Sequence, residues 1–175
     1  MTYTVLILAW TIALPLLSGP MAMAADIPGT TVAPLAMQAF CHNRPGECRP
    51  AQDAVVEWTP QLAALITETN ARVNRDIGPR ADPGGAWEVN PAFGDCNDYA
   101  VSKRSRLIRL GVPPGALRLA ITRTRGGLSH AILVVRTSAG DIVLDNLTGS
   151  IKTLAQSGYA IRSISTANPL RWARL

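Results

Sequence analysis

The spacing of apolar and polar positions predicts a helix in the middle of the chain. Thr59 is a residue type that caps helices, and Pro60 suits the first helical position. Apolar side chains then recur at helical spacing, at Leu62, Leu65, Ile66, Val73 and Ile77. Gly78 and Pro79 interrupt the pattern, so we expect the helix to run from Pro60 to the residues just before them.

A second helical pattern covers residues 101–110, where apolar residues recur at steps of three and four. Gly111 and Pro113 supply its end. The segment before it, Gly94–Ala100, has the sequence Gly-Asp-Cys-Asn-Asp-Tyr-Ala. Cys96 is therefore expected where a loop ends and this helix begins.

Strand patterns follow in the second half of the chain. Residues 116–123 alternate apolar and polar side chains, and residues 130–135 form the continuous apolar run of a buried strand. A turn at 138–140 leads into a further strand at 141–145, so these two segments predict a β-hairpin. Together the three strands predict an antiparallel meander, and residues 157–159 and 161–164 predict one or two more strands.

The first 24 residues have the pattern of a secretory signal peptide. An apolar run is followed by the small-x-small cleavage site at residues 22–24. The usual basic residues before the run are missing, which leaves an uncleaved anchor as the alternative, but a span needs about 20 apolar residues and a proline and a glycine interrupt this run. We expect a signal peptide at 1–24, one domain at 25–175 without a transmembrane segment, and a periplasmic or secreted location. Residues 26–35 are expected to be its flexible start.

Composition and charge narrow the class of partner. Of the 175 residues, 47% are hydrophobic, so the chain has enough apolar surface for a folded core. The net charge of +5 favours acidic partners in general. The basic residues are scattered, however, and aromatic residues make up only 5%. The chain therefore lacks the basic run interleaved with aromatic residues that would predict nucleic-acid binding. We expect a solvated basic surface and no nucleic-acid partner.

The three cysteines fit an exported protein. Cys41 and Cys48 flank a turn-rich loop that is short enough to close, and an oxidising compartment favours a disulfide between them. The alternative is a metal site that uses these two cysteines and His42, but no further Cys/His pair completes a zinc site. His42 is then a surface loop residue, and Cys96 is the candidate free thiol.

Cys96, His130 and Asp145 have the residue types of a cysteine nucleophile system. A thiol at a helix N-terminus lies beside unpaired N–H groups at the positive end of the helix dipole, which favours the thiolate and can hold an oxyanion. His130, which follows Cys96 in the chain, opens one strand of the hairpin, and Asp145 ends the other. Their side chains share a face only if the turn register has the right parity. Each residue alone also fits a structural role, but a thiolate, an imidazole and a carboxylate together are the parts of a nucleophile system.

Three blocks of sequence around these residues resemble the bacterial transglutaminase-like cysteine peptidases. That family includes the LapG-like periplasmic proteases that clip biofilm adhesins from the outer membrane. The resemblance rests on the blocks Gly94–Ala100, Gly127–Ala131 and Ile142–Asn146, and extends to Trp87, Lys103, Arg104 and the segment Asn168–Trp172. It implies an α+β, papain/transglutaminase-like fold, in which the nucleophile helix packs against an antiparallel sheet. It also implies Cys96 as nucleophile, His130 as general base and Asp145 as the residue that orients it.

The resemblance further implies a peptidase acting on a protein substrate, such as a cell-surface adhesin, with an inner-membrane receptor as regulatory partner. Acyl transfer to an amine is an alternative, and so is a non-catalytic exported module that binds an acidic envelope partner. Trp87 is a candidate for the wall of the cleft or for shielding the oxyanion, and Asn146 for supporting the imidazole.

The sequence requires no cofactor, and calcium is the one metal to consider. Calcium-dependent members of the family usually carry an acidic residue directly after the cysteine, where this chain has Asn97. An Asn carbonyl oxygen can still bind calcium, but fewer charges mean weaker binding. Calcium at Asp95, Asn97 and Asp98 therefore stays an open alternative.

Overall fold

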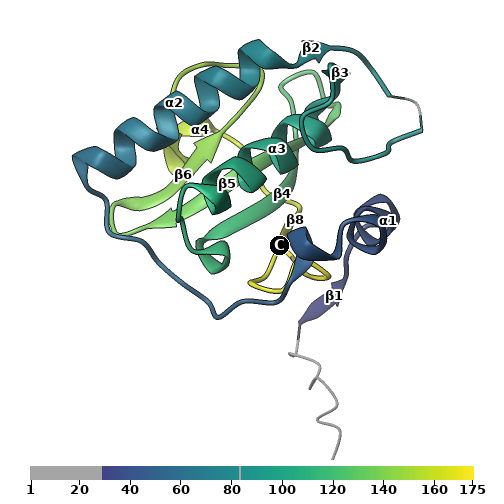
Figure 1. Cartoon of the computed structure of the whole chain (residues 1–175), viewed down its shortest axis with the longest axis horizontal. Helices are drawn as coiled ribbons and strands as arrows, with labels where there is room; N and C mark the ends of the chain where they lie inside the picture. Colours follow the sequence, from purple (N-terminus) through teal and green to yellow (C-terminus); the bar gives the residue numbers. More distant parts are fainter. Residues whose placement is uncertain (1–28, 83) are drawn as a thin grey trace, which may run out of the picture.

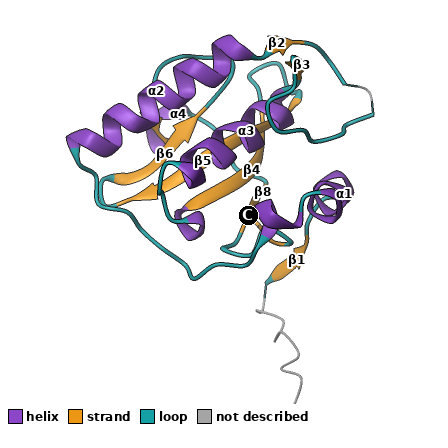
Figure 2. Cartoon of the chain, viewed as in Figure 1, coloured by secondary structure: helices purple, strands orange, loops and turns teal. Residues whose placement is uncertain are grey.

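A seven-stranded sheet with the order β1-β9-β8-β4-β5-β6-β7 organises the computed structural model, which describes residues 29–82 and 84–175 (Figure 1). All neighbouring strands in this sheet are antiparallel. Helices α2 and α3 cover one face, and the short α4 lies on the other (Figure 2). The chain thus has the α+β architecture, with an antiparallel sheet, that the sequence predicts. The predicted signal peptide at 1–24 lies outside the described residues.

The central strands confirm the predicted meander. They are β4 (Leu117–Arg123), β5 (Ser129–Thr137) and β6 (Gly140–Leu144). Gly140 has a φ of 102°, a conformation that glycine adopts easily, and it closes the tight β5–β6 turn. Alternate residues of β5 pack into cores on opposite faces of the sheet, which explains the continuous apolar run: Leu133 lies in the main core and Val134 in a smaller one.

Helices α2 (Pro60–Asp76) and α3 (Cys96–Arg109) form where the sequence predicts them. The Thr59 hydroxyl accepts a hydrogen bond from the Leu62 N–H at 3.1 Å, so it caps α2 as expected. Val101 and Leu107 of α3 are almost fully buried in the main core beside Leu133 of β5. None of the helices in the described ranges combines the length and the apolar character needed to cross a membrane.

The start of the domain differs from the prediction of a flexible segment. Thr30–Val32 form β1, which pairs with β9 (Arg171–Arg174), and α1 (Leu35–Asn43) follows directly. A three-residue strand is too short to show an alternating pattern, and it forms here because β9 offers it an open edge. The 3-10 helix η1 (Pro45–Cys48) comes next.

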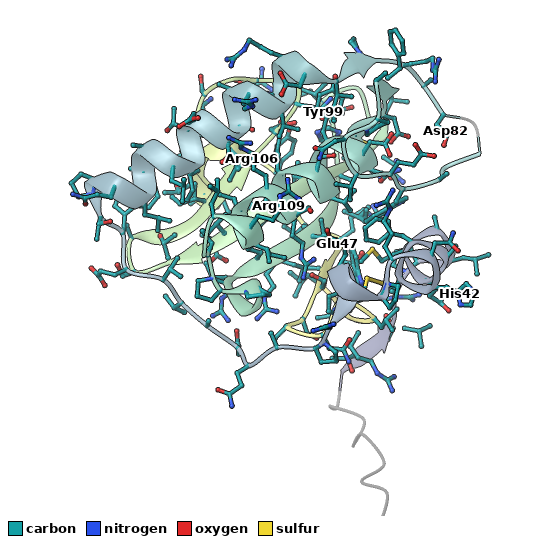
Figure 3. All side chains as sticks on the ribbon, viewed as in Figure 1. His42, Glu47, Asp82, Tyr99, Arg106 and Arg109 are labelled. Carbon is teal, nitrogen blue, oxygen red and sulfur yellow. A yellow bond between two sulfur atoms is a disulfide. The ribbon has the colours of Figure 1, made fainter. Side chains whose placement is uncertain are left out.

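The predicted disulfide between Cys41 and Cys48 is present and links α1 to η1. It replaces the alternative of a metal site at these cysteines. His42 is exposed in the last turn of α1 and points away from the sheet (Figure 3). It is a surface residue as predicted, although it belongs to a helix and not to a loop.

The C-terminal third contains one of the one or two further strands that the sequence predicts, and three unpredicted elements. Residues 157–159 form no strand, because α4 (Leu154–Ser157) starts in a capping box and ends at Gly158, whose φ is 73°. The predicted strand after it is β8 (Ser163–Ser165). The short strands β7 (Lys152–Thr153) and β9, like α4 itself, carry too few residues for a periodic signal.

The remaining elements bring the chain to the nucleophile helix. β2 (Gly78–Pro79) pairs in parallel with β3 (Phe93–Gly94), which directly precedes α3, and η2 (Pro114–Ala116) leads into β4. Two arginines depart from the predicted solvated basic surface: Arg104 is 3% exposed and Arg118 4% exposed. Arg104 donates to the Glu47 carbonyl oxygen at 2.6 Å, and Arg118 pairs with Asp53.

Candidate active site

Cys96 occupies the first position of α3, as the sequence predicts, and its thiol is half-buried and free. The helix start is fixed by a reciprocal capping box. The Asp95 carboxylate accepts the Asn97 N–H at 2.9 Å, and the Asp98 carboxylate accepts the Asp95 N–H at 2.9 Å. These contacts hold the backbone around the thiol, so Cys96 is presented at the positive end of the helix dipole.

His130 and Asp145 meet as a buried pair. The His130 Nε2 lies 2.8 Å from the Asp145 Oδ1, and the two residues are 3% and 1% exposed. The β5–β6 register pairs Leu133 with Leu144, which puts Asp145 on the same face of the sheet as His130. The turn therefore has the parity that the predicted imidazole–carboxylate pair requires.

The charges of this pair are set by competing effects. Burial alone would lower the pKa of His130, but the hydrogen bond to Asp145 and the neighbouring Cys96 side chain outweigh it and raise that pKa to about 9. Burial would raise the pKa of Asp145, but hydrogen bonds from His130, the Leu147 N–H and Tyr159 hold it below its usual value. At neutral pH the site therefore holds an imidazolium against a carboxylate, with Cys96 beside the ring.

Tyr159 is a site residue that the sequence does not reveal. Its hydroxyl donates to the Asp145 Oδ2 at 2.5 Å, and its ring centroid lies 5.9 Å from that of His130. The Leu147 N–H donates to Oδ1 at 3.0 Å, so both carboxylate oxygens are occupied. The turn at Gly158 directs Tyr159 to Asp145, and predicting residues 157–159 as a strand hides this.

A second unpredicted partner comes from α2. The Asn74 side-chain amide donates to the backbone carbonyl oxygen of Asp145 at 2.9 Å. This contact ties the end of β6 to α2, and so fixes the backbone that carries the carboxylate. No signal in the sequence points to it, because Asn74 lies on a helix that is distant in the chain.

Trp87 and Asn146 lie in different settings. Trp87 is 7% exposed and belongs to the main core, against which Cys96 packs. The Asn146 Oδ1 is buried and has no hydrogen-bond partner among the described residues, so no hydrogen bond to the imidazole is formed by this atom.

Lys103 is a second buried basic residue near this pair. It lies two turns along α3 from Cys96 and is 1% exposed. Burial lowers the pKa of Lys103 to about 7, although the charge of Asp145 opposes the shift. Its ammonium nitrogen lies 5.7 Å from the centroid of the Tyr99 ring.

The candidate calcium ligands are engaged in hydrogen bonds with neighbouring backbone groups. Asp98 is 4% exposed, and its two oxygens accept the N–H groups of Glu88 at 2.7 Å and Asp95 at 2.9 Å. Burial is the main reason that the pKa of Asp98 is raised. Across residues 29–82 and 84–175, no group of three or more His, Cys, Asp or Glu side chains has an arrangement that could hold a metal. The Asn97 N–H donates to the Asp95 carboxylate at 2.9 Å.

Comparison with known proteins gives a family and a fold. The model of the family described as "Bacterial transglutaminase-like cysteine proteinase BTLCP" matches residues 27–175. Calcium-bound Legionella pneumophila LapG has a similar structure, with a TM-score of 0.55 and 22% identity over 63% of this chain and 68% of that one. Another LapG structure from the same organism has a TM-score of 0.54 and 22% identity, over 63% of this chain and 66% of that one. EGTA-treated LapG has a TM-score of 0.52 and 19% identity, with the same coverage. A search of curated proteins finds no match.

Proposed function

Since the chain belongs to the bacterial transglutaminase-like cysteine proteinases, and is therefore a cysteine peptidase, we propose that Cys96, His130 and Asp145 form its catalytic triad. The observation that carries this proposal is the 2.8 Å contact between His130 and Asp145, with Cys96 as the other neighbour of the ring. The order of the three residues along the chain and the helix-start position of the thiol add support.

The geometry assigns a role to each ring nitrogen. Because Nε2 faces Asp145, Nδ1 is the nitrogen left to pair with the Cys96 thiolate. The Cys96 sulfur attacks the carbonyl carbon of the scissile peptide bond, and the oxyanion forms near the Cys96 N–H, which has no intrahelical acceptor at the first position of α3.

The protons then move through His130. Its Nδ1–H protonates the leaving amine as the C–N bond breaks, which leaves a thioester on Cys96 and a neutral imidazole. A water molecule gives its proton to that imidazole and attacks the thioester, and the thiolate leaves as a carboxylic acid product forms. Asp145 stays ionised throughout, and Tyr159 is a positioning residue that fixes the carboxylate.

We propose further that the peptidase is exported and acts on a protein of the cell surface, such as an adhesin. The signal-peptide pattern at residues 1–24 supports export to the periplasm or beyond, and the Cys41–Cys48 disulfide suits an oxidising compartment. The sequence resemblance supports the adhesin and an inner-membrane receptor as regulatory partner. Cell fractionation and N-terminal sequencing test the location: a mature chain that starts at residue 25 outside the cytoplasm is expected.

A peptide library tests the triad directly. We expect the purified protein to cleave a subset of peptides and the Cys96→Ala variant to cleave none. Equal cleavage by both proteins would exclude Cys96 as nucleophile. Mass spectrometry of the products with and without an added amine separates hydrolysis from acyl transfer, because hydrolysis leaves a free carboxylate and transfer leaves a new amide.

A further inference from the structure

A cavity of about 700 Å³ lies directly beside the His130–Asp145 pair. Asp145 and Tyr159 form part of its wall, and four basic residues surround it: Arg123, Arg125, Lys152 and Arg162. They come from the end of β4, the β4–β5 turn, β7 and the segment before β8. We call this cavity with its four basic residues the basic pocket.

The four basic side chains carry charge that nothing in the described part of the chain neutralises. Elsewhere in the described residues, arginines form ion pairs with Asp or Glu at Arg72, Arg104, Arg106, Arg118 and Arg136. None of the four residues of the basic pocket forms an ion pair among the described residues. Among the described residues that line the pocket, Asp145 is the only acidic one, and its charge faces His130. The pocket is therefore strongly positive.

The arginine side of the basic pocket is held by hydrogen bonds within the β4–β5 turn. The Thr124 N–H donates to the Leu128 carbonyl oxygen at 2.9 Å, and the Gly127 N–H donates to the Thr124 carbonyl oxygen at 2.9 Å. The Arg123 guanidinium donates to the Gly127 carbonyl oxygen at 2.5 Å. A turn fixed in this way presents its charges without a large ordering cost on binding.

The position of the pocket relates it to the reaction. Tyr159 lines the pocket, and its ring centroid lies 5.9 Å from that of His130. Cys96 also lies beside the His130 ring. If the scissile bond lies over Cys96, side chains a few residues from it come within reach of the pocket, because an extended peptide advances about 3.3 Å per residue. Clusters of arginine recognise acidic motifs in peptides by charge and by paired hydrogen bonds.

We infer that the basic pocket binds acidic side chains of the protein substrate, a few residues from the bond that is cleaved. This inference rests on the proposed function, because the pocket can bind substrate during cleavage only if the residues beside it are the catalytic triad. A nucleic acid is the less favoured ligand: among the described residues that line the pocket, Tyr159 is the only aromatic one, so successive bases have no series of aromatic rings on which to stack.

Binding can be measured without catalysis. We would use the full chain carrying Cys96→Ala and a fluorescein-labelled decapeptide with five Glu residues, compared with the same peptide carrying Gln in their place. Fluorescence anisotropy at low salt should show at least about tenfold tighter binding of the Glu peptide. Adding Arg125→Glu and Arg162→Glu should remove that preference, with circular dichroism confirming the fold.

The matched control carries Arg44→Glu and Arg49→Glu, at two exposed arginines that form no ion pair among the described residues, so it changes the net charge by the same amount. It should change binding by less than about twofold, because simple net charge acts weakly at a distance. Equal binding of the Glu and Gln peptides, or an equal loss with Arg44→Glu and Arg49→Glu, would overturn the inference. So would tighter binding of a labelled single-stranded oligonucleotide that the pocket variant abolishes.

Cleavage separates this inference from the proposed function. Peptides cleaved by the wild-type protein should be enriched in Asp or Glu on one side of the scissile bond, and the Arg125→Glu, Arg162→Glu variant should raise KM with kcat little changed. Cleavage that needs Cys96 but shows no acidic enrichment would reject the pocket and leave the triad in place. Glu-selective binding without Cys96-dependent cleavage would reject the triad, while the anisotropy result stands.

Discussion

His130 and Lys103 are both buried basic residues near the same carboxylate, yet their environments act on them in opposite directions. His130 on β5 touches Asp145 at 2.8 Å, and its pKa rises to about 9 although burial opposes the rise. Lys103 on α3 interacts with the charge of Asp145 without a hydrogen bond to it, and burial lowers the pKa of Lys103 to about 7. Their exposed fractions, 3% and 1%, are almost the same.

The difference shows that burial disfavours the charged form of both groups and that direct contact with a carboxylate outweighs it at His130. A short hydrogen bond to an ionised partner offsets the cost of removing the imidazolium from water, whereas the lysine has no hydrogen bond of that kind among the described residues. One carboxylate therefore supports a charged acid at His130 and leaves an amine that is about half protonated at pH 7 two turns along the nucleophile helix. Changes to Asp145, Lys103, Tyr159 and Asp98 test this comparison.

Asp145→Asn should have the largest effect, because it removes the contact that distinguishes His130 from Lys103. The asparagine keeps the shape of the side chain but not its charge, so the pKa of His130 should fall and the wrong ring tautomer becomes favoured. We expect kcat to fall by about 10³-fold. Steady-state kinetics on a library-derived peptide measures this, and NMR titration of the His130 ring measures the pKa.

Asp53→Asn is the control for that variant. Asp53 is also a carboxylate between two basic side chains, Arg118 and Arg136, and its pKa is lowered by them against a burial effect that would raise it. It lies away from the triad, so kcat should stay within about twofold of the wild type. An equal loss of activity in both variants would mean that Asp145 acts through folding and not through His130.

Lys103→Met should change how stability depends on pH. Between pH 7 and 9 the native His130 holds a proton that the unfolded chain has released above pH 6.5, so stability falls as pH rises. Lys103 has the opposite effect, because the unfolded chain keeps a proton up to pH 10.5 that the native state has lost above about 7. Each fully titrating group contributes about 1.4 kcal/mol per pH unit, so the two nearly cancel.

Removing Lys103 should expose the His130 contribution. Chemical denaturation of Lys103→Met should show the free energy of unfolding falling by about 1.4 kcal/mol per pH unit relative to wild type between pH 7 and 9. Lys152→Met, at an exposed lysine, should leave the wild-type slope unchanged. If Lys103→Met and wild type have the same slope, the native Lys103 is charged throughout and the contrast with His130 is wrong.

Tyr159→Phe should have a smaller effect, because it removes one of three hydrogen bonds to the Asp145 carboxylate and keeps the ring. Since the Tyr159 hydroxyl helps to lower the pKa of Asp145, the acidic limb of the kcat/KM profile should move to higher pH. At a pH on that limb, kcat/KM should fall by about tenfold or less, as expected for one hydrogen bond to a charged group.

Tyr99→Phe is the matched variant for Tyr159. The Tyr99 hydroxyl donates to the Ile77 carbonyl oxygen at 2.6 Å, so its loss removes a buried hydrogen bond that does not involve the triad. It should lower the melting temperature without moving the acidic limb. A shift of the limb in both variants would show that it reports general loosening of the fold.

Calcium chelation should have the smallest effect. Asp98, like Lys103, is a buried charged residue on α3. Backbone N–H groups already donate to both of its carboxylate oxygens, so it has little to gain from binding a metal. We expect EGTA to change kcat/KM by less than about twofold. A large loss that added Ca²⁺ restores would show that Asp95, Asn97 and Asp98 rearrange to bind the ion.

The sequence predicts the parts of this structure that repeat over many residues. Helix α2, the start of α3 at Cys96 and the β4–β5–β6 meander each span enough residues for a clear period and have recognisable ends. The pairing of Cys41 with Cys48 follows from chemistry and short spacing. The proximity of His130 and Asp145 depends on the parity of a turn, which the sequence leaves open and the register settles.

The surroundings of the pair are less predictable because they come from distant segments. Tyr159 reaches Asp145 only because four-residue α4 ends in a left-handed glycine, and Asn74 reaches it from α2 across 71 positions. The basic pocket brings together residues from four separate segments, which appear in the sequence as scattered charge. Such contacts are properties of tertiary packing and leave no local pattern.

Strand β1 has a consequence for biosynthesis. It pairs with β9, so Thr30–Val32 cannot take their place in the sheet until residues 171–174 have been made, and the Thr31 hydroxyl then donates a hydrogen bond to the Trp172 carbonyl oxygen 141 positions away. A nascent chain on the ribosome thus carries an unfinished edge until translation has passed that point. For a protein whose chemistry is the cutting of peptide bonds, this delay postpones the completed β1–β9 pairing until synthesis has passed β9.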